Sequence, residues 1–90
     1  MIDVRHKSGD LYVVTIREGG SETQHSVTAS AADVARLGNG VPAEAVIDAA
    51  FRFLLDREPK ETILGRFELM VIARYFPEFE RELPGYLTAS

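Results

Sequence analysis

Residues 42–76 read PAEAVIDAAFRFLLDREPKETILGRFELMVIARYF and hold most of the large apolar side chains of this 90-residue chain. Pro42 suits the first position of a helix, where its missing N–H would have no partner. At 100° per residue one face of the helix is apolar and two phenylalanines flank it: Ala43, Val46, Ile47, Ala50 and Leu54, with Phe51 and Phe53. Pro59 ends the helix, because proline disfavours helical angles in the residue before it. We expect this helix to be the centre of the core.

A second helix is predicted from Phe67 to Phe76, where apolar residues occur nearly all the way round. A helix with that pattern is either sunk in the core or shared between subunits. Pro77 breaks the pattern, and the charged residues 77–83 can form one more helical turn. Pro84-Gly85 then leads into a short tail.

The first 29 residues predict an antiparallel sheet. Residues 2–6 (IDVRH) alternate apolar and polar side chains, which is the period of a half-buried strand. Residues 11–17 (LYVVTIR) are β-branched or aromatic on both faces, as in a central strand, and residues 23–29 resume the alternation. Turns that contain glycine separate the three segments. We expect a three-stranded antiparallel meander.

A short helix is predicted from Ala31 to Leu37. Ser30 can cap its first turn, and Gly38 can end it because glycine tolerates the left-handed terminal conformation. Together these patterns predict an α+β fold, an N-terminal three-stranded antiparallel β-meander packed against a C-terminal bundle of three to four short helices. We expect a single domain over residues 1–90, with the meander at 1–29 and the helical part at 30–87.

Composition indicates an ordinary globular protein, with 46% hydrophobic and 27% charged residues. The chain has no cysteine, which excludes disulfides and thiolate metal sites and favours a reducing compartment. The N-terminus has no signal-like apolar run, and the apolar run at residues 69–73 is too short for a membrane span. We therefore expect a cytoplasmic protein without membrane contact. The net charge of −4 argues against nucleic acid as a partner.

No group of residues carries a chemical signature. His6 and His25 lie on the first and third predicted strands, about 10 Å apart at the usual strand spacing, so they cannot share a metal ion. The glutamates at positions 78, 80 and 82 have the spacing of a solvated helix face. Gly38-Asn39-Gly40 lacks the lysine of a phosphate loop, and no serine lies in a G-x-S-x-G elbow. We expect no catalytic residue, no metal and no cofactor, and hence no enzyme.

Apolar side chains near the C-terminus are too many to bury together in so small a core: Met70, Phe76, Phe79, Tyr86 and Leu87. Surplus apolar surface of this kind marks sites of protein contact. We interpret these five residues as a protein interface. The prediction is a small non-catalytic protein–protein interaction or regulatory module, whose partner is another protein or a second copy in a homodimer.

Two DNA-binding alternatives remain open from the pattern. From Thr23 onward, a strand, a short helix, a glycine turn and a longer helix resemble the ribbon-helix-helix family of dimeric bacterial repressors. That resemblance implies that Gln24, Ser26 and Thr28 point at base edges. The chain departs from the family in its short first helix and in a predicted ribbon without lysine or arginine. The second alternative is a helix-turn-helix over residues 61–76, turning at Gly65.

The C-terminal half resembles a group of short, functionally uncharacterised bacterial proteins. The residues that carry the resemblance are FLLDREP at 53–59, Ile63-Leu64, Phe67-Glu68-Leu69 and Tyr75-Phe76-Pro77-Glu78-Phe79. The resemblance covers about half of the chain. It implies a bacterial cytoplasmic origin and identifies no site.

Overall fold

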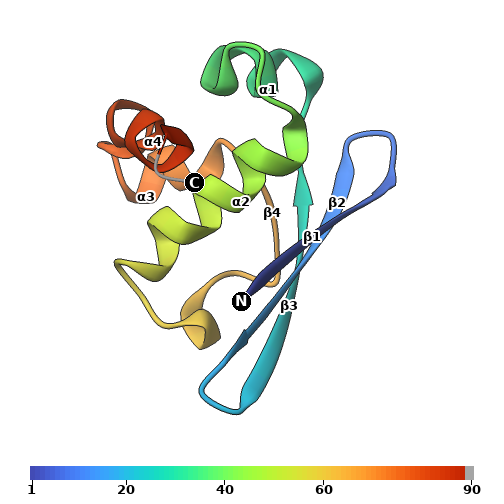
Figure 1. The fold of residues 1–90 in the computed structure, drawn as a ribbon, viewed down its shortest axis with the longest axis vertical. Helices are drawn as coiled ribbons and strands as arrows, with labels where there is room; N and C mark the ends of the chain where they lie inside the picture. The colour runs from blue at the N-terminus through green and yellow to red at the C-terminus, as the bar shows by residue number, and fades with distance from the viewer. Residues whose placement is uncertain (89–90) are drawn as a thin grey trace.

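The computed structural model describes residues 1–88, in which four strands and four α-helices follow one another (Figure 1). Their order is β1 (Ile2–Ser8), β2 (Leu11–Glu18), β3 (Ser21–Thr28), α1 (Ala31–Gly38), α2 (Ala43–Leu55), a 3₁₀ turn η1 (Lys60–Thr62), β4 (Arg66–Glu68), α3 (Val71–Tyr75) and α4 (Phe79–Thr88). The predicted α+β class is therefore confirmed.

The first three strands form the antiparallel meander that the sequence predicts. In their register Val4 lies beside Val14, and Val14 lies beside His25. Because side chains alternate across a strand, these residues share one face of the sheet, which the helices cover. The glycines of both turns have positive φ, a conformation that other residues rarely adopt.

A fourth strand corrects the predicted three-stranded sheet. Arg66–Glu68 forms β4 and pairs in parallel with β3, with Val27 beside Phe67, so the sheet is mixed and has the order β1-β2-β3-β4. The predicted helix from Phe67 is therefore wrong in its first four residues, and α3 begins at Val71. The physical reason is that the outer edge of β3 offers unpaired backbone groups, which bond to the chain at Gly65 and Leu69.

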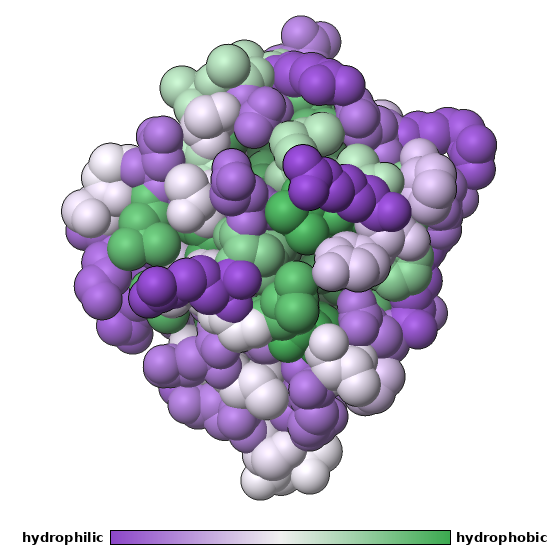
Figure 2. Space-filling model, turned by 180° about the vertical axis from the view of Figure 1, so that it is seen from behind, coloured by the Kyte–Doolittle hydropathy of each residue, from purple (hydrophilic) through white to green (hydrophobic). Residues whose placement is uncertain are grey.

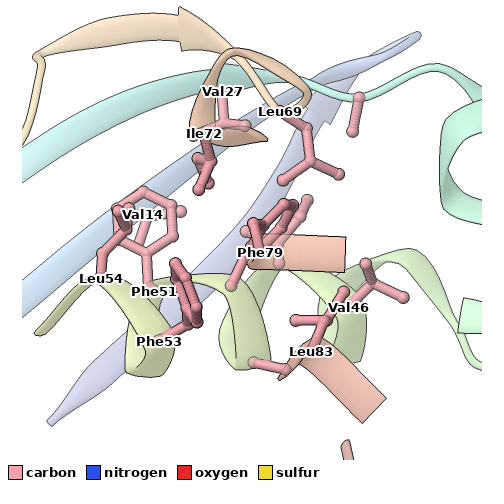
Figure 3. Close-up of a cluster of buried hydrophobic side chains, with 14 of the residues drawn as sticks. Val14, Val27, Val46, Phe51, Phe53, Leu54, Leu69, Ile72, Phe79 and Leu83 are labelled. Carbon is pink, nitrogen blue, oxygen red and sulfur yellow. The ribbon is translucent and has the colours of Figure 1, made fainter. Parts of the chain in front are cut away.

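Helix α2 lies between the sheet and α4, as the wide apolar face predicts. On one side the Phe51 ring lies 5.5 Å from the His25 ring and 5.9 Å from the Phe67 ring. On the other side the Phe53 ring meets the Phe79 ring edge-on at 5.1 Å. Figure 3 shows Phe51, Phe53 and Phe79 among the buried side chains between the sheet and the helices. The core therefore has three layers, with α2 in the middle.

The prediction of a short tail after Pro84-Gly85 is also wrong. Helix α4 continues through Pro84 to Thr88. Packing explains the difference, because Tyr86 in the last turns of α4 places its ring 5.8 Å from the ring of Phe53. Tertiary contact of this kind outweighs the intrinsic preference of proline to interrupt a helix.

The end of α1 differs from the prediction in one detail. Ser30 caps the helix as expected, accepting a hydrogen bond of 3.1 Å from the Asp33 N–H. The left-handed residue is Asn39, with φ of 48°, rather than Gly38. Gly38 is required for another reason, since a Cβ built on it would lie 2.5 Å from Cγ2 of Val46 in α2. It marks the close approach of α1 and α2.

Candidate interaction groove

An apolar groove of about 190 Å³ lies beside β4, between the C-terminal end of α2, η1 and α3. Its lining is almost entirely hydrophobic: Leu54, Glu58, Thr62, Ile63, Leu64, Phe67, Val71, Ile72, Tyr75 and Phe76. We call it the β4–α3 groove. Each of the surrounding elements contributes, so the groove exists only because β4 joins the sheet and α3 turns back over it.

Two large apolar side chains on the groove are open to solvent. Tyr75 is 66% exposed and Leu64 is 46% exposed, whereas the floor residues Phe67 and Ile63 are buried. The side of the molecule opposite to that of Figure 1 likewise has hydrophobic side chains gathered in the middle of a mainly hydrophilic surface (Figure 2). Exposed aromatic and aliphatic groups around a concave surface are typical of contact sites.

A buried histidine holds one rim of the groove. His25 on β3 is 3% exposed, and its Nδ1 lies 2.8 Å from the carbonyl oxygen of Leu64. A carbonyl only accepts, so Nδ1 carries a hydrogen and donates it. The other ring nitrogen, Nε2, lies 2.9 Å from the Thr23 hydroxyl, which can donate to it when the ring is neutral. His25 thus ties Leu64 to the sheet.

Glu58 provides the charged group of the lining. The hydroxyl of Thr62 donates to Oε1 of Glu58 at 2.8 Å and also to the carbonyl of Pro59 at 2.9 Å. These bonds fold the segment after α2 into the 3₁₀ turn and hold the Glu58 carboxylate at the groove. One side of an otherwise apolar surface is therefore negative.

Behind the groove, Arg57 joins the end of α2 to α4. Its guanidinium lies 3.6 Å from the centre of the Phe53 ring and donates to Glu78 at 3.1 Å and to Glu82 at 2.7 Å. Burial by itself would lower the pKa of Arg57. Hydrogen bonds to the side chains of Tyr86, Glu78 and Glu82 outweigh burial and raise that pKa. Hydrogen bonding from the backbone, and then from Arg57, lowers the pKa of the Glu78 carboxyl.

One of the five residues predicted as an interface does not reach the surface. Phe79 is fully buried and belongs to the core, whereas Met70, Phe76, Tyr86 and Leu87 are half-buried. Phe76 alone among the five lines the groove. The Tyr86 hydroxyl donates to a carboxylate oxygen of Asp56 and receives a hydrogen bond from Arg57.

Sequence reasoning missed Leu64 and Tyr75, the two exposed apolar residues of the groove. Leu64 lies between Pro59, where the first long helix is predicted to end, and Phe67, where the next is predicted to begin, so no predicted apolar face includes it. Tyr75 belongs to the helix predicted over residues 67–76, whose apolar residues are expected to be either sunk in the core or shared between subunits. A usable signal was present in the sequence, since Leu64 stands between Ile63 and Gly65 where a turn would ordinarily be polar.

Histidine and glutamate side chains that the sequence offers as candidate metal ligands or catalytic groups have partners within the domain. His6 Nε2 lies 2.6 Å from the Gly9 carbonyl oxygen, and the His6 ring stacks on Tyr12. Glu80 pairs with Arg36 at 2.8 Å. Within residues 1–88, no three histidine or carboxylate side chains gather as ligands for a metal ion.

Neither DNA-binding alternative matches the arrangement of the elements. β3 is paired on both sides over Ser26–Thr28, by β2 and by β4, so this part cannot form a two-stranded ribbon with a second copy. Residues 61–76 contain part of η1, β4 and the short helix α3 instead of two helices.

Comparison with known proteins adds no assignment. No known protein family, curated protein or solved structure matches this chain. Across the 88 described residues, helices are too short or too polar to cross a membrane. The geometry of the groove is therefore the basis for inferring function.

Proposed function

We propose that this protein is a small non-catalytic protein-interaction module, and that the β4–α3 groove takes a bulky apolar side chain from a segment of a partner protein. The observation that carries the proposal is the pair of exposed apolar residues, Tyr75 and Leu64, at a groove with a hydrophobic floor. Tyrosine is enriched among the residues that dominate binding energy in protein interfaces.

The size of the groove favours a protein side chain over a whole small molecule. Its volume of about 190 Å³ is below the range of roughly 300–1,000 Å³ that pockets for drug-sized ligands occupy. One leucine, phenylalanine or tyrosine side chain is a suitable occupant, held by the apolar floor. The rest of the partner segment would lie across the exposed rim.

Charge narrows the chemistry of the partner. Glu58 lies in the lining, and the whole chain carries a net charge of −4. A lysine or arginine next to the apolar anchor would lie near the Glu58 carboxylate and be attracted to the protein from a distance. The preferred partner is therefore a segment in which a bulky apolar residue stands beside a basic one.

The cellular setting is part of the same proposal. The lack of cysteine favours a reducing compartment. The resemblance of residues 53–79 to short bacterial proteins favours a bacterial cytoplasm, where such a module would regulate or assemble a partner by contact.

The test uses a phage-displayed library of random peptides, selected on the full chain and then counter-selected on the Leu64→Lys variant. Enriched peptides are synthesised with a fluorescent label, and their affinities are measured by anisotropy. Tyr75→Ala should weaken binding at least tenfold, which is the usual effect at a dominant contact residue. Glu58→Gln should weaken binding of basic peptides while its amide oxygen still accepts from Thr62.

The matched control is Ala32→Lys, which changes an exposed position on α1 outside the groove lining and should leave affinity unchanged. Peptides without a bulky apolar residue, or peptides that bind the Tyr75→Ala variant as well as the unmodified chain, would overturn the proposal. Far-UV circular dichroism verifies that each variant is folded.

A further inference from the structure

We propose that the free edge of β1 pairs with β1 of a second copy of this chain, in an antiparallel register centred on Val4, to form a homodimer with a continuous eight-stranded sheet. The occupant of this edge follows from the charges that β1 carries. Asp3 and Arg5 are arranged so that the strand is complementary to itself in that register alone.

β1 is an edge strand, paired with β2 and with no other described strand. The Arg17 N–H donates to the Met1 carbonyl at 2.9 Å, so the backbone groups of Met1 face β2. In an antiparallel ladder this direction alternates along the strand. The N–H and C=O groups of Ile2, Val4 and His6 therefore point outward, away from the sheet, where another strand can reach them.

A two-fold axis through Val4 uses all of these outward groups. Val4 then faces Val4 of the second copy, and Ile2 faces His6 of the second copy, as hydrogen-bonded pairs. The same operation places Asp3 opposite Arg5 of the second copy, and Arg5 opposite its Asp3. Within one chain the Nε of Arg5 lies 3.3 Å from the Asp3 carboxylate. The two side chains, 44% exposed for Asp3 and 80% exposed for Arg5, lie on one face of the strand, so each can also reach its counterpart in the second copy.

Other registers are disfavoured by charge. Moving the axis to position 3 places Asp3 opposite itself, and moving it to position 5 places Arg5 opposite itself. Like charges directly opposite destabilise a strand pair. If the pairing shifted by one residue, the half-buried Ile2 and Val4 of one copy would lie on the opposite face of the joint sheet from those of the other copy. Only the axis at Val4 combines two attractive pairs with a continuous apolar face.

The strand also limits its own pairing. The register with β2 shifts between His6 and Ser8, an irregularity that ends the flat part of the edge. Bulges of this kind stop edge strands from adding further chains. A closed dimer over residues 2–6 is expected rather than an open fibre.

The test is sedimentation equilibrium of the full chain over micromolar to near-millimolar concentrations. The unmodified chain should reversibly form a dimer. Asp3→Arg and Arg5→Asp should each weaken self-association by about tenfold, because each creates two like-charge contacts. An equimolar mixture of the two variants should form a heterodimer, and the double variant Asp3→Arg/Arg5→Asp should dimerise like the unmodified chain.

Three results would overturn the proposal. A chain that stays monomeric throughout shows that the charges on β1 protect the edge. A dimer that neither single substitution weakens has its interface elsewhere. Weakening that neither the mixture nor the double variant restores shows that the substitutions do not act through paired charges. Val4→Pro adds an independent check, since it removes an outward N–H that β2 does not use and should abolish dimerisation without unfolding the domain.

This inference does not rest on the β4–α3 groove. β1 and β4 are the two opposite edges of the sheet. The Leu64→Lys variant should therefore dimerise normally, and its sedimentation distinguishes a failure of one proposal from a failure of the other.

Discussion

Replacing Phe79 with alanine should destabilise this domain more than any change on its surface. The Phe79 side chain is completely buried, and its ring meets the ring of Phe53 edge-on at 5.1 Å. It joins the first turn of α4 to α2, the middle layer of the core. Removing it exposes the far side of α2 and leaves a cavity that the short helix α4 cannot fill by itself.

The size of the effect follows from that burial. Truncation of a buried phenylalanine to alanine costs about 3–5 kcal/mol, including the cavity. The whole domain is expected to have a net stability of roughly 5–13 kcal/mol at its length. For a domain of this size 1 kcal/mol shifts the unfolding midpoint by about 4–8 °C, so Phe79→Ala should lower it by about 12–40 °C.

Thermal and urea unfolding followed by circular dichroism at 222 nm measure the change, because the chain has no tryptophan. Phe79→Leu should fall between the unmodified chain and Phe79→Ala. Tyr75→Ala is the matched surface control, since Tyr75 is 66% exposed and its loss should change stability by no more than about 0.5 kcal/mol. Equal midpoints for Phe79→Ala and Tyr75→Ala would refute the placement of α4 on α2.

Three further changes test the packing of α2. Gly38→Ala should destabilise the domain by about 1–3 kcal/mol, because the new Cβ meets the stiff side chain of Val46. Val46→Ala in the same chain should relieve this strain, and urea unfolding measures both effects. Arg57→Met should lower the unfolding midpoint more than Arg52→Met, whose ion pair stays within one helix. Because the pKa of Glu78 is lowered in the folded state, the contribution of its carboxylate to the free energy of unfolding is complete above the unfolded-state pKa and is lost as pH falls below about 4. Glu78→Gln should therefore make the free energy of unfolding less dependent on pH in that range.

The sequence was sufficient to predict the meander and α2, because each is encoded by contacts between residues close in sequence. Alternation at Ile2, Val4, Val14 and Ile16 defines the buried face of the sheet without reference to the rest of the chain. The apolar stripe of α2 has the helical period, and the wide arc that includes Phe51 and Phe53 already implied contacts on two sides.

The sequence could not predict β4, because that strand depends on a partner about forty residues away. Arg66–Glu68 has three residues and no alternation long enough to recognise. It is extended because the edge of β3 is available at Ser26–Thr28 and because Phe67 fits against Phe51. The same reasoning applies to α4, in which the contact of Tyr86 with Phe53 keeps the chain helical past Pro84.

The candidate site depends on the same long-range pairing. Leu64 lies at the rim because His25 holds its carbonyl, and Tyr75 is exposed because β4 shortens the helix to Val71–Tyr75. The interface residues were predicted from the apolar character of each residue alone. That criterion included Phe79, which is buried, and omitted Leu64, which is exposed. Exposure is set by tertiary packing, so an interface of this kind cannot be found from composition.

The two proposed contacts make one joint prediction, since a dimer formed through β1 would carry two β4–α3 grooves. A partner with a single copy of the binding segment would engage each groove independently, whereas a surface that displays many copies would hold both grooves at once and bind more tightly. Asp3→Arg should therefore leave the affinity for a free selected peptide unchanged, and it should weaken retention on beads coated densely with that peptide. Tyr75→Ala should weaken both measurements. Equal loss of bead binding and free-peptide binding in Asp3→Arg would show that the β1 edge and the groove are coupled, contrary to their positions at opposite edges of the sheet.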